Sequence, residues 1–299
     1  KMSKISVIVP IGGKRKMEAL QSLQNQEEKV EIIVENGPNP SRNRNKGIKK
    51  SSKEIIAFVD AHSIMPKNWS RKIGIFFKQN EEYDIVGGPQ LTPQDENLIG
   101  KASGYALSSI FGSAEVSARY SPNKSIKEAN EKFLTSANLA CRRRVFSKIK
   151  FDEKIYPGED PKFIDDAKNA GFKIVYSPDI FVFHRRRQSI KELAKQIFNY
   201  GVARPKKESL GRTLKNPSFL VPALFVLYIP LFAIFSLFNF IFTLPLALYI
   251  ILNIIFSVYE GIKNNDLASI FLLPFIFFTI HIMYGIGFIY GYIGRKHEK

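Results

Sequence analysis

A long stretch without charges limits the fold of this chain more than any other feature. Residues 218–259 contain no Asp, Glu, Lys, Arg or His, and residues 267–294 contain only His281 of these types. About 20 apolar residues cross the hydrocarbon core of a bilayer as a helix. The first stretch is long enough for two crossings and the second for one. Buried helices of soluble proteins rarely run this far without a charge, so we predict a membrane region of two or three helices over residues 217–294.

The direction of the crossings raises a conflict with the basic tail, residues 295–299. Three crossings from the cytoplasm would place this tail outside, against the tendency of cationic segments to stay inside. Either Pro222 and Pro230 make the first apolar segment re-entrant or interfacial, or the tendency is outweighed here. Both explanations stay open.

The remaining sequence is mixed and highly charged. The whole chain has 44 Lys and Arg against 27 Asp and Glu, a net charge of +17, which suits anionic lipid headgroups or phosphate-bearing substrates. Nucleic acid is a poorer partner, because the basic residues lack a recognised nucleic-acid-binding motif. The single cysteine, Cys141, fits a reducing compartment. No signal-peptide pattern opens the sequence, so we expect an integral membrane protein whose first domain, residues 1–189, stays on the cytoplasmic face.

Short apolar runs predict the architecture of this first domain. Runs rich in β-branched residues occupy residues 5–9, 30–34, 55–59 and 83–86, with helix-like segments between them. This alternation predicts an α/β fold with a mostly parallel sheet flanked by helices. Ligands of such sheets lie beyond the carboxyl ends of the strands. Those ends hold Pro10-Ile11-Gly12, Glu35-Asn36-Gly37 and Asp60-Ala61-His62.

A metal site is predicted from three residues at strand ends. Asp60 and His62 follow one predicted strand, and His184 follows another at residues 180–183. Carboxylate oxygens suit Mg²⁺ and Mn²⁺, and imidazole favours transition metals. The arginines after His184, including Arg187, would suit a diphosphate or lipid phosphates, and both uses stay open.

Two adjacent acids predict a catalytic base. Glu159 and Asp160 lie in a loop framed by glycine and proline. Pro161 fits the first position of a helix, which predicts Asp160 as its N-cap. Two acids exceed what capping needs, so we predict Asp160 as a general base, with Glu159 binding acceptor hydroxyls or polarising Asp160. Elsewhere, Arg44 and Asn45 open a cationic helix start that favours nucleotide phosphates.

Two segments are predicted to meet the membrane surface. Residues 190–216 combine an amphipathic helix with a cationic link directly before the first apolar stretch. Basic amphipathic helices of this kind often lie in the interface. Residues 98–113 could add a second interfacial face or form a core helix, and the sequence favours neither.

Several motifs, taken in order, resemble glycosyltransferase family 2. The resemblance covers about residues 3–205 and is carried by Ser6-Val7-Ile8-Val9-Pro10, Glu35-Asn36-Gly37, Arg44-Asn45-Lys46-Gly47-Ile48, Asp60-Ala61-His62, Ser136-Ala137-Asn138-Leu139-Ala140, Glu159-Asp160 and Ala170-Gly171-Phe172. Within that family, Gly87-Gly88-Pro89 and the spacing of Gln196, Tyr200, Gly201 and Arg204 resemble the membrane-anchored succinoglycan-biosynthesis type.

The resemblance implies a GT-A fold and an inverting transferase of hexosyltransferase type that uses a nucleoside-diphosphate sugar. It implies Asp160 as base, Asp60 at the ribose and metal, and Glu35 near the nucleobase. The expected donor-binding set is Pro10, Ile11, Gly12, Glu35, Arg44, Asn45, Asp60, Ala61, Asn138 and Arg187. Glu35-Asn36 and His62 depart from the family's usual acids. An Asp-x-His with a later His resembles the manganese site of polypeptide N-acetylgalactosaminyltransferases, which favours Mn²⁺ over Mg²⁺.

The membrane region adds an expectation about the acceptor. A membrane-anchored transferase would suit an acceptor on polyprenyl phosphate or diphosphate, used in surface polysaccharide or glycoconjugate assembly. A processive polysaccharide synthase is disfavoured, because those enzymes usually carry Gln-x-x-Arg-Trp and the one tryptophan here is Trp69. An inactive lipid-binding scaffold is disfavoured by intact Asp60, Asp160 and His184. No oligomeric state is predicted.

Overall fold

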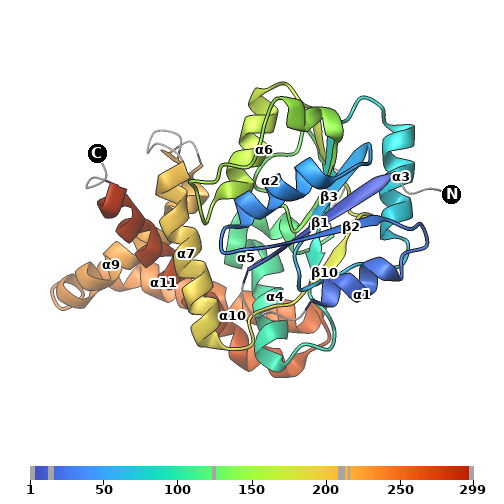
Figure 1. The fold of residues 1–299 in the computed structure, drawn as a ribbon. Helices are drawn as coiled ribbons and strands as arrows, with labels where there is room; N and C mark the ends of the chain where they lie inside the picture. Colours follow the sequence, from blue (N-terminus) through green and yellow to red (C-terminus); the bar gives the residue numbers. More distant parts are fainter. Residues whose placement is uncertain (1–3, 13–16, 123–125, 208–212, 215, 296–299) are drawn as a thin grey trace. The chain divides into compact units, whose positions relative to one another are not determined.

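The structure is a computed structural model that describes residues 4–12, 17–122, 126–207, 213–214 and 216–295 (Figure 1). The chain divides into two compact units. The first contains residues 1–93 and 115–185, and the second contains residues 94–114 and 186–299. The chain therefore passes between the units three times. The predicted boundary at residue 189 lies near the last passage, whereas the sequence did not separate residues 94–114 from the first domain.

The first unit is built on a mixed sheet with the strand order β2-β1-β3-β8-β5-β9-β7. Its strands are β1 (Ile5–Ile11), β2 (Glu31–Asn36), β3 (Ile55–Val59), β5 (Ile85–Gly87), β7 (Ile126–Lys127), β8 (Asn138–Arg142) and β9 (Ile174–Tyr176). A smaller sheet contains β4 (Ser63–Ile64), β10 (Val182–His184) and β6 (Gln90–Leu91). The helices are α1 (Glu18–Gln24), α2 (Pro40–Lys50), α3 (Trp69–Gln79) and α6 (Glu159–Asn169), with 3-10 turns η1 (Ala114–Arg119) and η2 (Arg143–Ser147).

The predicted α/β fold is confirmed, and the large sheet includes β8, a central strand that the apolar runs did not predict. β1 pairs in parallel with β2 and β3, as expected from successive strand–helix–strand units. β8 runs antiparallel between β3 and β5. Its first residue, Asn138, therefore lies opposite Val59 at the carboxyl end of β3. The reversed strand brings the segment before β8 to the edge of the sheet where the parallel strands end.

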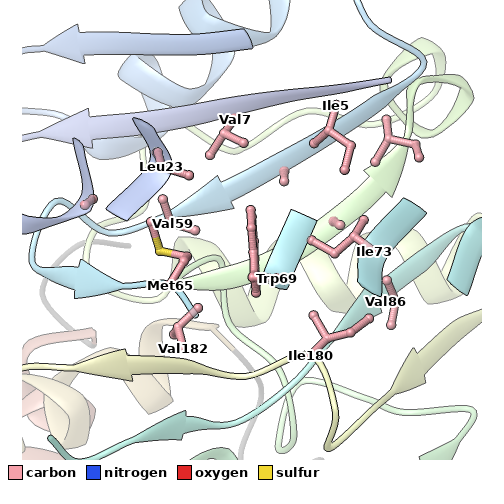
Figure 2. Close-up of a cluster of buried hydrophobic side chains, with 14 of the residues drawn as sticks. Ile5, Val7, Leu23, Val59, Met65, Trp69, Ile73, Val86, Ile180 and Val182 are labelled. Atoms are coloured by element: carbon pink, nitrogen blue, oxygen red, sulfur yellow. The ribbon is translucent and has the colours of Figure 1, made fainter. Parts of the chain in front are cut away.

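Both faces of the sheet are buried, which explains the continuous apolar runs of its strands. Alternate side chains of β1 and β3 enter two separate cores. One core lies under α1 and α3, where Figure 2 shows Trp69 and Ile73 beside Val7 and Val59. The other holds Phe58, with Phe163 of α6 and Ile48 of α2. Two packed faces hold the strand ends, and the polar residues that follow them, in fixed positions.

The second unit is helical in the described residues. It contains α4 (Leu98–Ser108), α5 (Ile110–Ser113), α7 (Ile190–Lys207), α9 (Val221–Phe235), α10 (Leu244–Lys263) and α11 (Leu267–Arg295), with 3-10 turns η3 (Pro217–Phe219) and η4 (Phe240–Thr243). By length and composition, two helical segments could cross a membrane: Phe240–Lys263 with a mean hydropathy of 2.3, and Leu267–Gly294 with 2.0. The 15 residues of α9, which include Pro230, are fewer than a crossing needs.

Close contacts between backbones hold α7 against α11. A Cβ atom added to Gly287 of α11 would lie 2.2 Å from the Phe198 carbonyl oxygen of α7. One added to Gly201 of α7 would lie 2.3 Å from the Tyr284 carbonyl oxygen of α11. Small residues let helices approach in this way where no larger side chain fits. On α7, Leu193 and Ile197 are buried, whereas Ile190 at its start is exposed.

The Gly287→Ala variant should destabilise the second unit, because its new methyl group would overlap a backbone carbonyl. Overpacking of this kind costs about 1–3 kcal/mol. Gly294→Ala in the same helix is the matched control, since an added Cβ there meets nothing within 4 Å. Thermal unfolding of the detergent-solubilised full chain should show a lower Tm for Gly287→Ala only. Equal Tm values for the two variants would contradict the tight helix contact.

Candidate functional site

Polar segments of the first unit meet where β1, β2 and β3 end. The Gly37 backbone N–H donates to the Ile11 carbonyl at 3.0 Å. Asn43 Nδ2 donates to the carbonyls of Ile11 and Gly37 at 3.2 and 2.9 Å. These bonds join the ends of β1 and β2, where the predicted donor-binding residues Gly12 and Glu35 lie. Asn43, which the sequence analysis did not single out, is the residue that joins them.

The structure brings the three predicted metal ligands together. Asp60 directly follows β3, and His184 ends β10, where it pairs with Ser63. Potential ligand atoms of Asp60, His62 and His184 all lie within 4.8 Å of one another. His184 Nε2 lies 3.2 Å from Asp60 Oδ2, and the ring centroids of the two histidines are 4.3 Å apart. One carboxylate and two imidazoles at this spacing could hold a divalent transition metal.

Asp60 is held in its charged form. Burial opposes the charge, but the hydrogen bond with His184 and the proximity of His62 and Arg44 outweigh it. The pKa of Asp60 is therefore well below its usual range. A carboxylate that stays ionised at neutral pH is suited to bind a cation.

A buried arginine joins this group to the predicted base. Arg44 lies on α2 with its side chain 4% exposed. Its Nη1 lies 3.0 Å from Glu159 Oε1 and 3.4 Å from Asp160 Oδ1, and its Nη2 lies 3.8 Å from Asp60 Oδ1. Burial opposes its charge, but Asp160, Glu159 and Asp60 raise the pKa of Arg44. The sequence analysis placed Arg44 at a phosphate, whereas in the structure its contacts are with three carboxylates.

Asp160 lies in the first turn of α6, which corrects one prediction. The helix begins at Glu159 and its N-cap is Gly158, so the predicted N-cap role of Asp160 is wrong. Gly158 has a φ of 118°, which a residue with a Cβ rarely adopts, and this starts the helix two residues before Pro161. In the first turn, the unpaired N–H groups favour a negative side chain. Ser136 Oγ donates to Asp160 Oδ1 at 2.5 Å.

Glu159 is buried beside the predicted base. Its side chain is 8% exposed and accepts from Arg44. Burial and the neighbouring Asp160 carboxylate together raise the pKa of Glu159 to about 7, although Arg44 acts in the opposite direction. Glu159 can therefore bind or release a proton near neutral pH.

Other predicted residues have partners away from this group. Asn138 Oδ1 accepts from Trp69 Nε1 at 3.1 Å, and its Nδ2 donates to the Ile180 carbonyl at 2.7 Å. Asn45 Nδ2 donates to the Phe151 carbonyl at 2.9 Å. These bonds fix the protein's own loops. The roles of Asn138 and Asn45 at a donor stay predictions.

The remaining donor-binding predictions are distributed between the units. Buried Glu35 pairs with Lys50 Nζ at 2.6 Å, and the Ala61 carbonyl accepts from the Ala19 N–H at 3.1 Å. Pro10 and Ile11 lie on β1, with Gly12 directly after it. Arg187 belongs to the second unit, where its Nε donates to Gln196 at 3.2 Å.

Ser136 lies beside the predicted base and was not among the predicted site residues. Its hydroxyl is bonded to Asp160. Its position two residues before β8 explains the omission, because the apolar runs did not predict that strand. A predicted strand there would have placed Ser136 at the same edge as Asp60.

Stability should fall with rising pH because of Glu159. The pKa of Glu159 is about 7 in the folded chain and 4.5 in its ordinary state. Glu159 therefore stabilises the folded chain fully below about pH 4.5, and this contribution is lost as the pH rises to about 7. Glu159→Gln cannot lose a proton, so its Tm should rise relative to that of the unmodified chain across this range. Thermal unfolding at half-unit pH steps measures the difference. Parallel Tm curves for the two proteins would contradict the raised pKa.

Comparison with known proteins finds a family match for the part of the chain that contains Arg44, Asp60 and His62. Residues 14–150 match the model of glycosyl transferase family 2. No curated protein matches the sequence. Among solved structures, the Pyrobaculum calidifontis mannosyltransferase PcManGT, in complex with GDP-Man and Mn²⁺, has 12% identity and a TM-score of 0.56; the match covers 99% of this chain and 88% of that one. This likeness shows a shared fold.

Two further structures are of Staphylococcus aureus TarS. Residues 1–349 of TarS with UDP-GlcNAc give 14% identity, a TM-score of 0.46 and coverage of 97% and 92%. A longer TarS structure gives 16% identity and a TM-score of 0.44, and the match spans 67% of this chain and 39% of that one. The family match and the shared fold lead to one conclusion. Residues 14–150, a little under half of the chain, match glycosyl transferase family 2, and this match together with the shared fold supports a glycosyltransferase.

Proposed function

We propose that this chain is a membrane-attached, metal-dependent glycosyltransferase that inverts the anomeric carbon. The donor is a nucleoside-diphosphate sugar, and the acceptor is a hydroxyl of a glycan on polyprenyl phosphate or diphosphate. One observation carries the proposal: Arg44 contacts Asp160, Glu159 and Asp60, and Asp60 lies beside His62 and His184. A base and a cation-binding group therefore adjoin each other at the ligand-binding edge of the sheet.

The metal proposal rests on the chemistry of its donors. Asp60 is held ionised, and the imidazoles of His62 and His184 are close enough to share one ion with it. This set fits Mn²⁺ better than Mg²⁺, because Mg²⁺ prefers oxygen ligands. A bound cation would supply positive charge for the diphosphate leaving group. PcManGT, which shares the fold, was solved with GDP-Man and Mn²⁺, and this supports both the metal and the donor class.

Asp160 is proposed as the base that takes a proton from the acceptor hydroxyl. Its carboxylate accepts from Ser136 and faces Arg44, and these two partners fix its orientation. Glu159 would bind acceptor hydroxyls through a carboxyl that exchanges its proton near pH 7. Displacement by the deprotonated hydroxyl on the face opposite the diphosphate inverts the anomeric centre.

The donor contacts are proposed at the loops after β1, β2 and β3. Glu35 would lie near the nucleobase, and Pro10, Ile11, Gly12, Asn45, Ala61, Asn138 and Arg187 complete the proposed set. The bonds of Asn43 to Ile11 and Gly37 support this placement, because they hold the ends of β1 and β2 together before a ligand binds. A preformed arrangement lowers the ordering cost of binding.

Membrane attachment is proposed through α10 and α11, with the catalytic unit on the cytoplasmic face. Their outward side chains are large, apolar and exposed, among them Leu248, Ile251, Phe271 and Phe275. A continuous apolar surface of this kind marks a membrane or protein contact. The basic helix α7, which packs on α11, would lie at the headgroups. A membrane position would suit a lipid-linked acceptor and a succinoglycan-type role in surface polysaccharide assembly.

The Asp160→Asn variant should lose transfer and keep donor binding. Removing a general base costs about 10²–10⁴-fold in rate. Asp166→Asn on the same helix is the control, since Asp166 pairs with Lys162 and lies outside the group. Turnover of nucleotide sugars with Mn²⁺ and a polyprenyl-linked acceptor provides the assay. Transfer at the unmodified rate by Asp160→Asn would refute the assignment of the base.

The His184→Ala variant should lose Mn²⁺ binding. Losing a residue that only orients a metal ligand weakens metal affinity by about tenfold to a hundredfold. Losing a ligand itself should weaken the Mn²⁺ affinity by at least as much. Titration of free Mn²⁺ by electron paramagnetic resonance measures this without turnover. Asp160→Asn serves here as the control that should still bind the ion. Equal Mn²⁺ affinity in both variants would exclude His184 as a ligand.

A further inference from the structure

Residues 94–114 lie inside the family 2 region of the sequence but belong to the second unit of the structure. They fall within the matched residues 14–150, between β6 and η1. Yet their helices α4 and α5 pack with α10 and α11 rather than with the sheet. The sequence explains this preference in part, because residues 102–112 contain no charged side chain.

Phe111 is inserted between α10 and α11, the two helices that are long and apolar enough to cross a membrane. Its ring stacks on Phe256 of α10 at a centroid distance of 5.0 Å and lies 5.8 Å from Tyr249. On α11, it meets Phe277 at 5.1 Å and His281 at 5.0 Å. Tyr249 and Phe256 lie on either side of the middle of α10, Leu244–Lys263. The tip of the segment therefore lies level with the middle of these helices and away from their polar ends.

Several backbone carbonyls beside the break between α4 and α5 have hydrogen-bond partners, which an apolar environment favours. Two serine hydroxyls bind backbone carbonyls in the last turn of α4. Ser108 Oγ donates to the Tyr105 carbonyl at 2.9 Å, and Ser113 Oγ donates to the Leu107 carbonyl at 2.5 Å. The Phe111 carbonyl lies 2.8 Å from His281 Nε2, whose other ring nitrogen lies 3.0 Å from the Tyr249 hydroxyl. A surface helix in water would not need such pairing.

The residue next to this anchor is apolar and exposed. The side chain of Ile110 is 68% exposed. Outward side chains of α10 are exposed to a similar degree; Ile255, for example, is 54% exposed. On a water-facing surface, the contact of the Ile110 side chain with water would be unfavourable. Among acyl chains the same side chain would be favourable, because its apolar surface would be removed from water.

We propose that α4 and α5 enter the bilayer together with α10 and α11, and that Ile110 lies among the acyl chains. The inference rests on the membrane attachment in the proposed function. It adds that the sequence of the catalytic region itself contributes a membrane-inserted element. The catalytic unit would then be tied to the membrane at residues 93–94 and 114–115 as well as at 185–186.

A single-site fluorescent label tests this placement. The native Cys141 is fully buried, so Ile110→Cys supplies the reactive thiol for an environment-sensitive dye. Ile255→Cys is the reference position on α10, and Lys150→Cys, exposed in the first unit, is the aqueous reference. The full-length proteins are reconstituted in phosphatidylcholine–phosphatidylglycerol vesicles. Quenching is measured with acyl-chain spin-labelled lipid and with aqueous iodide, after retained donor turnover has confirmed folding.

The label at residue 110 should be quenched by the acyl-chain spin label to within about twofold of the label at residue 255, and should resist iodide. Quenching at 255 but not at 110, with iodide access at 110, would overturn the inference and leave the membrane attachment intact. Iodide access at both positions would overturn the inference together with the attachment. The label at 150 should respond to iodide in every case.

Discussion

The buried guanidinium of Arg44 determines how the site is arranged. A cation removed from water needs opposite charges at close range, and here three carboxylates from β3 and α6 supply them. Leaving such a buried charge without its partners costs about 3–5 kcal/mol. The start of α6 and the turn after β3 are therefore held toward one helix, α2. With three acids facing one arginine, the group retains negative charge, which favours a divalent cation beside Asp60.

The order of strands makes this convergence possible. Parallel strands end at the same edge of a sheet, so the carboxyl ends of β1, β2 and β3 lie side by side there. The antiparallel strand β8 adds residues from its beginning to the same edge and brings Ser136 to Asp160. The small sheet adds His184, because β10 pairs with β4 directly after the Asp60 turn. Five separate parts of the chain thus contribute to one group of side chains: α2, the turn after β3, the segment before β8, the start of α6 and the end of β10.

Much of this could be predicted from the sequence, and the rest depended on pairing over long distances. Runs of buried residues identify strands such as β1 and β3, because burial on both faces leaves a continuous apolar pattern. The grouping of Asp60, His62 and His184 also followed from strand ends. The direction of β8 could not be read, since its run Asn138-Leu139-Ala140-Cys141 is short and mixed. The contacts of Arg44 were also hidden, because its partners lie 16 to 116 residues away.

The chain passes between its two units three times, and this affects where it can be truncated to give a stable fragment. A fragment ending at residue 189 would appear from the sequence to be a complete catalytic domain. It would retain α4 and α5 but lose α10 and α11, and with them the rings that enclose Phe111 and the imidazole that pairs with its carbonyl. The uncovered helices would present fresh apolar surface and promote aggregation. A soluble catalytic fragment would need residues 94–114 replaced by a short polar connection.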